Sequence, residues 1–202
     1  MIDTITKNRK KEIIVFAGPN GSGKSTITNF LQVKYEYINA DAIKRATNCT
    51  DLEAAIKATE MREDLLNKNK DFAFETVLST ERNLDLLKRA KAKDYFIRSY
   101  FILTKDVNIN INRIEQRVLK GGHGVPVDKI RSRYLKSIDN LKELIRISDI
   151  CNVYDNSNAK IRRIFKKRKE EYYFNESKHW NKNEIIGLTG IAQMIEKDLN
   201  NF

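Results

Sequence analysis

The chain has 202 residues, of which 38 are Lys or Arg and 27 are Asp or Glu, for a formal net charge of +11. This length can bury a hydrophobic core without disulfides or structural metal, and it predicts a single domain over residues 1–202. No apolar run approaches the ~18 residues of a membrane span, and residues 1–11 lack the apolar stretch of a secretory signal. Cys49 and Cys151 have no metal-ligand spacing, so we expect a cytoplasmic protein with reduced thiols and no bound zinc.

Apolar spacing predicts that strands and helices alternate along the chain as far as Asp155. The predicted strands are 12–17, 35–40, 71–78, 95–103 and 151–154, and the predicted helices are 24–34, 52–67, 81–93, 107–120 and 127–146. Such alternation favours an α/β fold with a parallel sheet covered on both faces. Beyond this region, 160–174 predicts a short β-hairpin and 184–199 a closing helix, which together form a C-terminal unit of about 160–200.

Positive charge concentrates in two segments, 111–136 and 160–171. Each segment contains seven basic and two acidic residues, so the two account for nearly all of the excess charge. This clustering indicates an anionic partner, either a nucleotide or a nucleic acid. A solvated basic face is the alternative interpretation of each segment.

A glycine-rich segment follows the first predicted strand and leads into the first predicted helix. Its sequence, Gly-Pro-Asn-Gly-Ser-Gly-Lys-Ser over 18–25, fits the pattern of a phosphate-binding loop (P-loop), and a strand before and a helix after it are the expected context. The glycines permit backbone conformations that point successive N–H groups at an anion. The sequence therefore predicts a site for ATP and Mg²⁺ formed by Gly18, Pro19, Asn20, Gly21, Ser22, Gly23, Lys24, Ser25 and Thr26. In this site we expect Lys24 to reach the β- and γ-phosphates, Ser25 to ligate the Mg²⁺ and Thr26 to contact the α-phosphate.

Acidic residues follow two of the predicted strands. Asp41 comes after the second strand and Glu75 lies near the end of the third, and ligands in open α/β sheets bind beyond such strand ends. A carboxylate in line with the γ-phosphate can orient and deprotonate an acceptor hydroxyl. We therefore expect Asp41 to be the catalytic base and Glu75 to hold the acceptor or a magnesium-bound water. The alternatives are a helix N-cap for Asp41 and a solvated strand end for Glu75.

Arginines flank a glycine-rich bend in the first basic segment. Arg113 and Arg117 stand one helical turn apart, and Arg133 lies in the helix that follows 121–126, Gly-Gly-His-Gly-Val-Pro. A helix–glycine–helix hairpin of this kind predicts an arginine lid over about 107–146, which closes on the transferring phosphoryl group and excludes water. We expect Arg117 and Arg133 to face the phosphates because guanidinium groups bind phosphate oxygens bidentately.

Taken together and in this order, these motifs resemble the zeta toxin family of P-loop kinases. The resemblance extends over about 13–157, and its most specific parts are 18–26, 39–41, 74–76, 117–126, 130–134, 137–141 and 153–157. Within the family the chain is similar to the small stand-alone branch, whose lid has this Gly-Gly-His and Arg-Tyr pattern.

The resemblance implies a P-loop kinase with a five-stranded parallel sheet and ATP as donor. It also implies an acceptor of the UDP-N-acetylamino sugar class, whose 3′-hydroxyl is phosphorylated so that cell-wall synthesis stops, and an antitoxin protein as partner by analogy. The roles implied by motif position are phosphate and Mg²⁺ binding by Lys24 and Ser25, proton abstraction by Asp41, acceptor contacts by Glu75 and Thr76, and phosphate clamping by Arg117 and Arg133. Arg113 is assigned to the substrate side of the lid, and Asn156 to the neighbourhood of the adenine.

Two other classes of function stay open on the residues alone. The net charge and the run 160–169, with Tyr172, Tyr173 and Trp180 nearby, fit a polynucleotide kinase or another nucleic-acid-binding ATPase. An ATP-hydrolysing regulator without an acceptor is the third class. No predicted strand ends convincingly in the hydrophobic run followed by Asp that is typical of mechanical ATPases, and Asp106 after the strand 95–103 is a weak candidate. This disfavours motors, transporters and GTPases.

Overall fold

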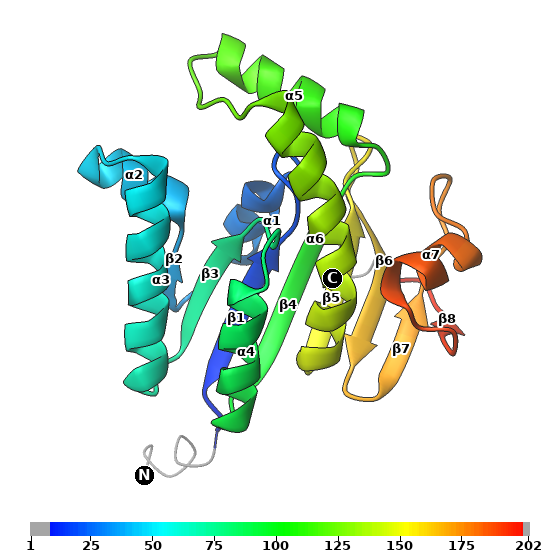
Figure 1. The fold of residues 1–202 in the computed structure, drawn as a ribbon. Coiled ribbons are helices and arrows are strands. Elements are labelled where there is room, and N and C mark those ends of the chain that lie inside the picture. The colour runs from blue at the N-terminus through cyan, green and yellow to red at the C-terminus, as the bar shows by residue number, and fades with distance from the viewer. Residues whose placement is uncertain (1–8, 200–202) are drawn as a thin grey trace.

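A single sheet runs through the molecule, which is a computed structural model that describes residues 9–199 (Figure 1). The strand order is β2-β3-β1-β4-β5-β6-β7-β8. The strands are β1 (Glu12–Ala17), β2 (Glu36–Ile38), β3 (Phe72–Thr76), β4 (Phe96–Leu103), β5 (Ile150–Asp155), β6 (Arg162–Arg168), β7 (Glu171–Phe174) and β8 (Ile195–Glu196). Strands β1 to β5 pair in parallel, whereas β6 and β7 add an antiparallel hairpin and β8 pairs in parallel with β7.

Helices cover both faces of this sheet. They are α1 (Lys24–Leu31), α2 (Ala40–Thr47), α3 (Asp51–Asn67), α4 (Arg82–Ala92), α5 (Val107–Leu119), α6 (Val127–Ile147) and α7 (Lys182–Thr189). In Figure 1, α3, α4, α6 and α7 lie in front of the sheet and α1 lies behind it. Helices α2 and α5 and the start of α6 stand beyond the carboxyl ends of the parallel strands, where ligands bind in sheets of this kind.

The central strand shows why helices pack on both faces. Ile13 and Val15 of β1 belong to the large core that includes side chains of α3, α4, α6 and α7, while Phe16 belongs to the smaller core that includes Ile27 of α1. Successive side chains of a strand point to opposite faces, so this strand needs an apolar partner on each side.

The predicted α/β architecture is confirmed, but the sheet is larger than expected. The five parallel strands form its first part, and the predicted hairpin of residues 160–174 extends the sheet from the edge of β5. Phe165 lies opposite Val153 of β5 and opposite Phe174 of β7, and all three side chains are buried. Burial of these apolar side chains favours the extended sheet.

The prediction of a closing helix over 184–199 is wrong in extent. Helix α7 begins at Lys182 and ends at Thr189, because Gly190 follows with φ of 73° and donates its N–H to Ile186 O. A glycine in the left-handed conformation is a common helix end. The chain then forms the short strand β8, and the C-terminal three residues of the sequence lie outside the described part, as do residues 1–8, on which the secretory-signal expectation mainly rests.

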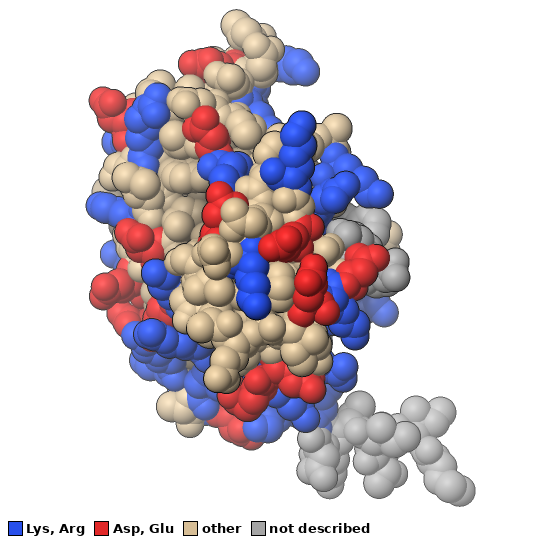
Figure 2. Space-filling view, turned by 90° about the vertical axis from the view of Figure 1, so that its right-hand side faces the viewer, with Lys and Arg blue, Asp and Glu red and all other residues tan. Residues whose placement is uncertain are grey.

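The second basic segment is only partly a solvated face. Lys167 is buried and donates to Ile145 O at 2.9 Å and Arg146 O at 3.1 Å, at the end of α6, while Arg163 donates to Leu199 O. Cations near a helix C-terminus satisfy carbonyl groups that lack partners within the helix. Figure 2 shows the side of the molecule on the right of Figure 1, where basic and acidic side chains are interspersed.

Two further observations concern membranes and thiols. Over residues 9–199 the structure contains no helix with the length and apolarity needed to cross a membrane. Cys49 and Cys151 are both free thiols, and Cys151 is buried in the sheet.

Candidate active site

The P-loop adopts a backbone conformation that requires glycine, as Gly21 and Gly23 show. Gly21 has φ of 77° and Gly23 has φ of 94°, both in the left-handed region. A Cβ at Gly21 would lie 2.6 Å from Asn110 O, and one at Gly23 would lie 2.2 Å from Nδ2 of Asn156. The segments that contain Asn110 and Asn156 therefore pack directly against the loop. The loop leads into the N-terminus of α1.

Polar groups without partners indicate that this loop is built to hold an anion. The N-terminus of α1 has no side-chain cap, so its first N–H groups are available to a ligand. Within residues 9–199, Arg113 Nη1 is buried without a hydrogen-bond partner, as is Ser22 Oγ in the loop. Ser25 is exposed at the start of α1, with a hydroxyl that fits a magnesium ligand. These residues suit a triphosphate with Mg²⁺.

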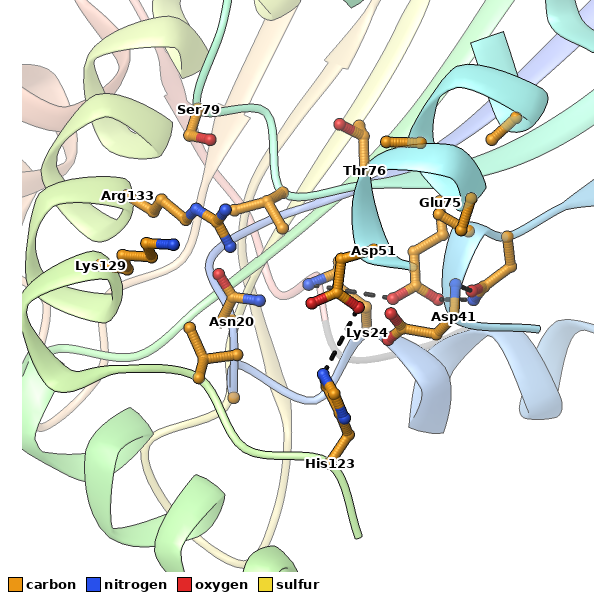
Figure 3. A pocket seen from close by; sticks show the side chains of 18 of the residues that line it. Asn20, Lys24, Asp41, Asp51, Glu75, Thr76, Ser79, His123, Lys129 and Arg133 are labelled. Atoms are coloured by element: carbon orange, nitrogen blue, oxygen red, sulfur yellow. Dashed lines mark hydrogen bonds and ion pairs between the residues drawn. The ribbon is translucent and has the colours of Figure 1, made fainter. Parts of the chain in front are cut away.

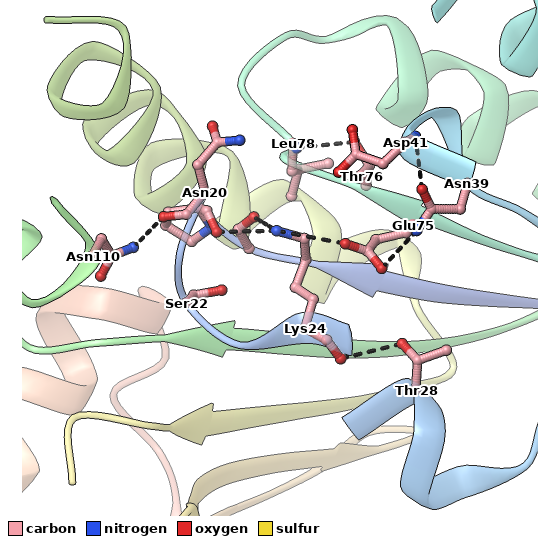
Figure 4. Close-up of polar contacts among 12 residues, drawn as sticks. Asn20, Ser22, Lys24, Thr28, Asn39, Asp41, Glu75, Thr76, Leu78 and Asn110 are labelled. Atoms are coloured by element: carbon pink, nitrogen blue, oxygen red, sulfur yellow. Dashed lines mark hydrogen bonds and ion pairs between the residues drawn. The ribbon is translucent and has the colours of Figure 1, made fainter. Parts of the chain in front are cut away.

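Lys24 is held at the junction of the P-loop and the sheet. Its side chain is buried, and Nζ donates to Gly18 O at 2.8 Å and to Pro19 O at 3.0 Å (Figure 4). Burial lowers the pKa of Lys24, and the negative charges of Glu75 and Asp41 oppose that shift. The ammonium group therefore lies where acidic side chains from two other elements converge.

Asn39 connects the backbone at Asp41 to the side chain of Glu75. As N-cap of α2, its Oδ1 accepts from the N–H groups of Asp41 at 2.8 Å and Ala42 at 3.2 Å, and its Nδ2 donates to Glu75 Oε2 at 3.1 Å. The N-cap alternative for Asp41 is therefore wrong, since Asn39 occupies that position. Among the described residues, the Asp41 carboxylate has no hydrogen-bond partner, and Figure 3 shows it on the same side as Glu75 and Lys24.

Glu75 and Thr76 end β3 in a network of hydrogen bonds. Glu75 Oε2 accepts from Tyr37 Oη at 2.8 Å, and burial, together with this carboxylate, raises the pKa of Tyr37 to about 12. The solvated alternative for Glu75 is wrong, because its side chain is only 13% exposed. Thr76 Oγ1 accepts from Leu78 N and from Asn83 Nδ2, so the hydroxyl shapes the turn after β3.

One cavity of about 760 Å³ brings most of the predicted site residues together (Figure 3). Its lining includes Asn20, Gly21, Gly23, Lys24, Ser25, Asp41, Glu75, Thr76, Arg113, Arg117 and Arg133. Gly18, Pro19, Ser22, Thr26 and Asn156 do not line it. Gly18 and Pro19 instead accept from Lys24, and Asn156 packs on the P-loop, where its Nδ2 donates to Ser22 O at 2.8 Å.

The lid is formed by α5, the glycine-rich bend and α6, and its arginines differ in what they contact. Arg113 donates to Asn156 O at 2.8 Å, which connects the lid to the end of β5. Arg117 is exposed and Arg133 is half-buried, and neither forms an ion pair among the described residues. His123 in the bend lies 3.5 Å from Asp51 Oδ1 and 3.1 Å from Lys44 Nζ, so the bend meets the α2–α3 side of the cavity mouth.

Sequence reasoning missed three basic residues that line the cavity outside the P-loop and the predicted arginine pair. Arg62 of α3 and Arg82 of α4 both line it, as does Lys129 of α6. A signal for Arg62 existed, because it continues the buried stripe of α3 four residues after Ala58 and four before Leu66. An arginine in a stripe of small and apolar residues is unusual enough to indicate a functional position.

Comparison with known protein sequences shows one family relationship. The chain is 30% identical over 131 residues to an uncharacterized protein of Haemophilus influenzae, a match that covers 62% of this chain and 94% of that protein. The chain belongs to the same family as that protein. The sequence matches no protein-family model.

Solved structures identify the fold. A chain of the PezAT chromosomal toxin–antitoxin system of Streptococcus pneumoniae is 17% identical, with a TM-score of 0.52, covering 79% of this chain and 72% of that chain. A chain of the AvrRxo1-ORF1:ORF2 complex with ATP is 12% identical, with a TM-score of 0.66, covering 84% of this chain and 62% of that one. The fold is that of a zeta-toxin-like P-loop kinase. A chain of the Pnkp1/Rnl/Hen1 RNA repair complex is 16% identical, with a TM-score of 0.52, covering 67% of this chain and 47% of that chain.

Proposed function

We propose that the protein is an ATP-dependent kinase that transfers the γ-phosphate of ATP to a hydroxyl group of a small molecule. The observation that carries this proposal is the Asp41 carboxylate, which lacks a hydrogen-bond partner in the described chain and lines the same cavity as Lys24 and the lid arginines. ATP as donor is supported by the shared fold with the AvrRxo1-ORF1:ORF2 complex, whose structure was solved with ATP. Mg²⁺ held by Ser25 would neutralise charge on the phosphates.

In the proposed reaction the acceptor oxygen forms a bond to the γ-phosphorus while the bond between that phosphorus and the β,γ-bridging oxygen breaks. Asp41 takes the proton of the acceptor hydroxyl. Glu75 and Thr76 orient the acceptor at the end of β3, and Lys24 holds the phosphates. Arg117 and Arg133 neutralise the charge of the transferring group when the lid is closed, with Arg113 on the substrate side. The adenine lies near Asn156 in this proposal.

For the acceptor we propose the UDP-N-acetylamino sugar class, as implied by the resemblance to zeta toxins. The test incubates the protein with Mg-ATP and UDP-N-acetylglucosamine and follows the sugar nucleotide by mass spectrometry. A singly phosphorylated sugar nucleotide supports the assignment. ADP formed in equal amount with and without the sugar nucleotide, and no phosphorylated product, contradicts it and favours the ATP-hydrolysing class.

A second candidate function is polynucleotide kinase, favoured by the shared fold with a chain of the RNA repair complex and by the net charge of +11. The same assay with a 5′-hydroxyl oligonucleotide distinguishes the two. This candidate predicts a phosphorylated oligonucleotide and an affinity that falls steeply with salt. The polynucleotide-kinase candidate depends on the basic residues of 160–169. Two of them, Lys167 and Arg163, donate hydrogen bonds to carbonyl groups within the molecule instead.

We extend the proposal to a cytoplasmic location and an antitoxin-like protein partner. Among the described residues, eight large apolar side chains are exposed, and seven of them lie on α3 or the lid helices: Leu52, Ile56, Met61, Val118, Leu119, Val127 and Leu135. Exposed apolar side chains concentrated on a few elements are the kind of surface that a protein partner can cover. PezAT is a toxin–antitoxin system, and the AvrRxo1 structure is a complex of two proteins, ORF1 and ORF2. Co-purification of a neighbouring gene product that blocks ATP binding would support this part.

A further inference from the structure

Arg62 is a buried arginine that the reaction described above does not use. Its residue exposure is 6%, and it lines the cavity from α3. Nη2 donates to Thr59 Oγ1 at 3.0 Å, whereas Nε is buried and has no hydrogen-bond partner among the described residues. The guanidinium lies over the ring of Phe74, 5.2 Å from its centroid.

No carboxylate of the described chain forms an ion pair with this guanidinium. Burial, with a smaller contribution from the charge of Arg82, lowers the pKa of Arg62 to about 10 against the opposing charge of Glu63, and the group remains protonated at neutral pH. A buried charge is strongly unfavourable unless it is paired. The Phe74 ring covers one face of the guanidinium but cannot accept its in-plane N–H groups. These N–H groups therefore need a hydrogen-bond acceptor.

The cavity wall around Arg62 has room and polar groups for a ligand that accepts these hydrogen bonds. Ala54, Ala55 and Ala58 face the cavity from α3 with small side chains, and hydroxyl groups of Thr59, Ser79 and Thr80 line it nearby. Arg82 adds a second guanidinium from α4. This wall is therefore a cationic subsite on α3 and α4.

The lid and the P-loop already supply the cations that a triphosphate needs. Lys24, Arg113, Arg117 and Arg133 come from those two elements. Arg62 and Arg82 come from two different helices, so one cavity contains two separate sets of cations. A single nucleotide bound at the P-loop accounts for the first set only.

We propose that Arg62, assisted by Arg82, binds an anionic phosphate group of the acceptor molecule. The inference rests on the proposed function, because it assigns the second set of cations to the second substrate. Guanidinium groups match phosphate oxygens in geometry and form charge-assisted hydrogen bonds with them. The acceptor is therefore a phosphate ester or a diphosphate that also has a free hydroxyl group. Neutral sugars and alcohols would leave Arg62 unpaired and are expected to be poor acceptors.

The direct test uses NMR of the full chain saturated with Mg²⁺ and a non-hydrolysable ATP analogue, so that the P-loop is occupied. The Arg62 Nε–H resonance is assigned by its absence from the spectrum of Arg62→Lys. Titration with inorganic phosphate is expected to shift this resonance. The apparent phosphate affinity is followed through backbone amide resonances, which wild type and variants share, and is expected to fall about tenfold in Arg62→Gln. Lys57→Gln, which removes a charge from the exposed face of α3, is expected to leave the titration unchanged.

An Arg62 resonance that phosphate does not move, or equal phosphate affinity in wild type and Arg62→Gln, would overturn the inference. Matching backbone amide spectra of wild type and Arg62→Lys show that the fold is intact. The transfer assay keeps the two proposals distinguishable. If no acceptor is phosphorylated but phosphate still shifts Arg62, the kinase proposal fails and the anion subsite stands. If transfer occurs, Arg62→Gln is expected to raise the KM for the acceptor at least about tenfold and to change that for ATP less than about twofold.

Discussion

The ammonium group of Lys24 lies 3.9 Å from Oε1 of Glu75, at the point where the P-loop meets the end of β3. The two side chains are 8% and 13% exposed, so their attraction is screened less than that of a surface pair. In this position Lys24 also donates to the carbonyls of Gly18 and Pro19. The lysine thus links the phosphate-binding loop to the acidic wall of the cavity.

Lys24→Ala tests this link. The substitution removes a cation that we assign to the phosphates, and charge-assisted hydrogen bonds contribute about 1.5–3 kcal/mol each. We expect the affinity for Mg-ATP to fall at least about tenfold and phosphoryl transfer to be lost. Calorimetric titration with a non-hydrolysable ATP analogue measures the affinity. Lys68→Ala, an exposed lysine paired with Asp64, is the control, and unchanged nucleotide affinity in Lys24→Ala would contradict the assignment.

We expect Asn39 to contribute to stability through Oδ1, which caps α2, and to activity through Nδ2, which donates to Glu75. Asn39→Ala removes the N-cap of α2, which we expect to lower the free energy of unfolding by about 0.5–2 kcal/mol. Asn39→Ser keeps a capping oxygen but loses the amide that donates to Glu75, so we expect near-normal stability with reduced transfer. Urea unfolding and a transfer assay on both variants separate the two roles. Equal loss of stability in both variants would show that capping is not the function of Asn39.

The sequence predicted the parallel sheet and the grouping of site residues well, for physical reasons. The P-loop has a fixed spacing because its backbone must surround an anion, and the strand ends place Asp41 and Glu75 at one edge of the sheet. The sequence did not predict the partners of Glu75, because the hydrogen bonds from Tyr37 and Asn39 depend on side-chain geometry.

The remaining differences also have identifiable causes. Residues 184–199 have helical apolar spacing, but Gly190 ends α7 early, and a conformation with positive φ is not visible in spacing. The basic segment 160–171 lies in a strand hairpin whose Lys167 is needed at the end of α6. Such a long-range contact has no local sequence signal. Arg62 was missed because a single arginine in a helix usually points to solvent.

The lid arginines should affect turnover more than binding. Arg133→Gln and Arg117→Gln each remove a guanidinium that we assign to the charge developing in transfer, and loss of one such donor typically lowers kcat by about 10²–10³. Arg131→Gln is the matched control, since Arg131 donates to Asn108 Oδ1 and does not line the cavity. Steady-state kinetics with saturating ATP measures the effect. A loss in Arg131→Gln as large as in Arg133→Gln would show that the lid acts through general stability.

The two cysteines should differ sharply in reactivity. Burial raises the pKa of Cys151 to about 12, so at neutral pH this group is a thiol, which is unreactive, and its side chain is inaccessible. We expect a thiol reagent such as DTNB to modify Cys49 in the native protein and Cys151 only after unfolding. Cys49→Ser isolates the Cys151 signal. Rapid modification of native Cys49→Ser would contradict the placement of Cys151 inside the sheet.

Asp41→Asn tests the central claim most directly, because it removes the base while keeping the shape of the side chain. Asn39 still caps α2 in this variant, and the lost charge in the first turn should change stability by only about 0.3–1 kcal/mol. Asp51→Asn, at an exposed carboxylate that also lines the cavity, is the matched control.

The decisive measurement is the rate of acceptor phosphorylation alongside the affinity for Mg-ATP in Asp41→Asn. Our account predicts that transfer falls by at least about 10²-fold while nucleotide affinity stays within about twofold of wild type. Transfer at the wild-type rate, or a parallel loss of ATP binding and turnover, would contradict the assignment of Asp41 as the base and with it the proposed kinase mechanism.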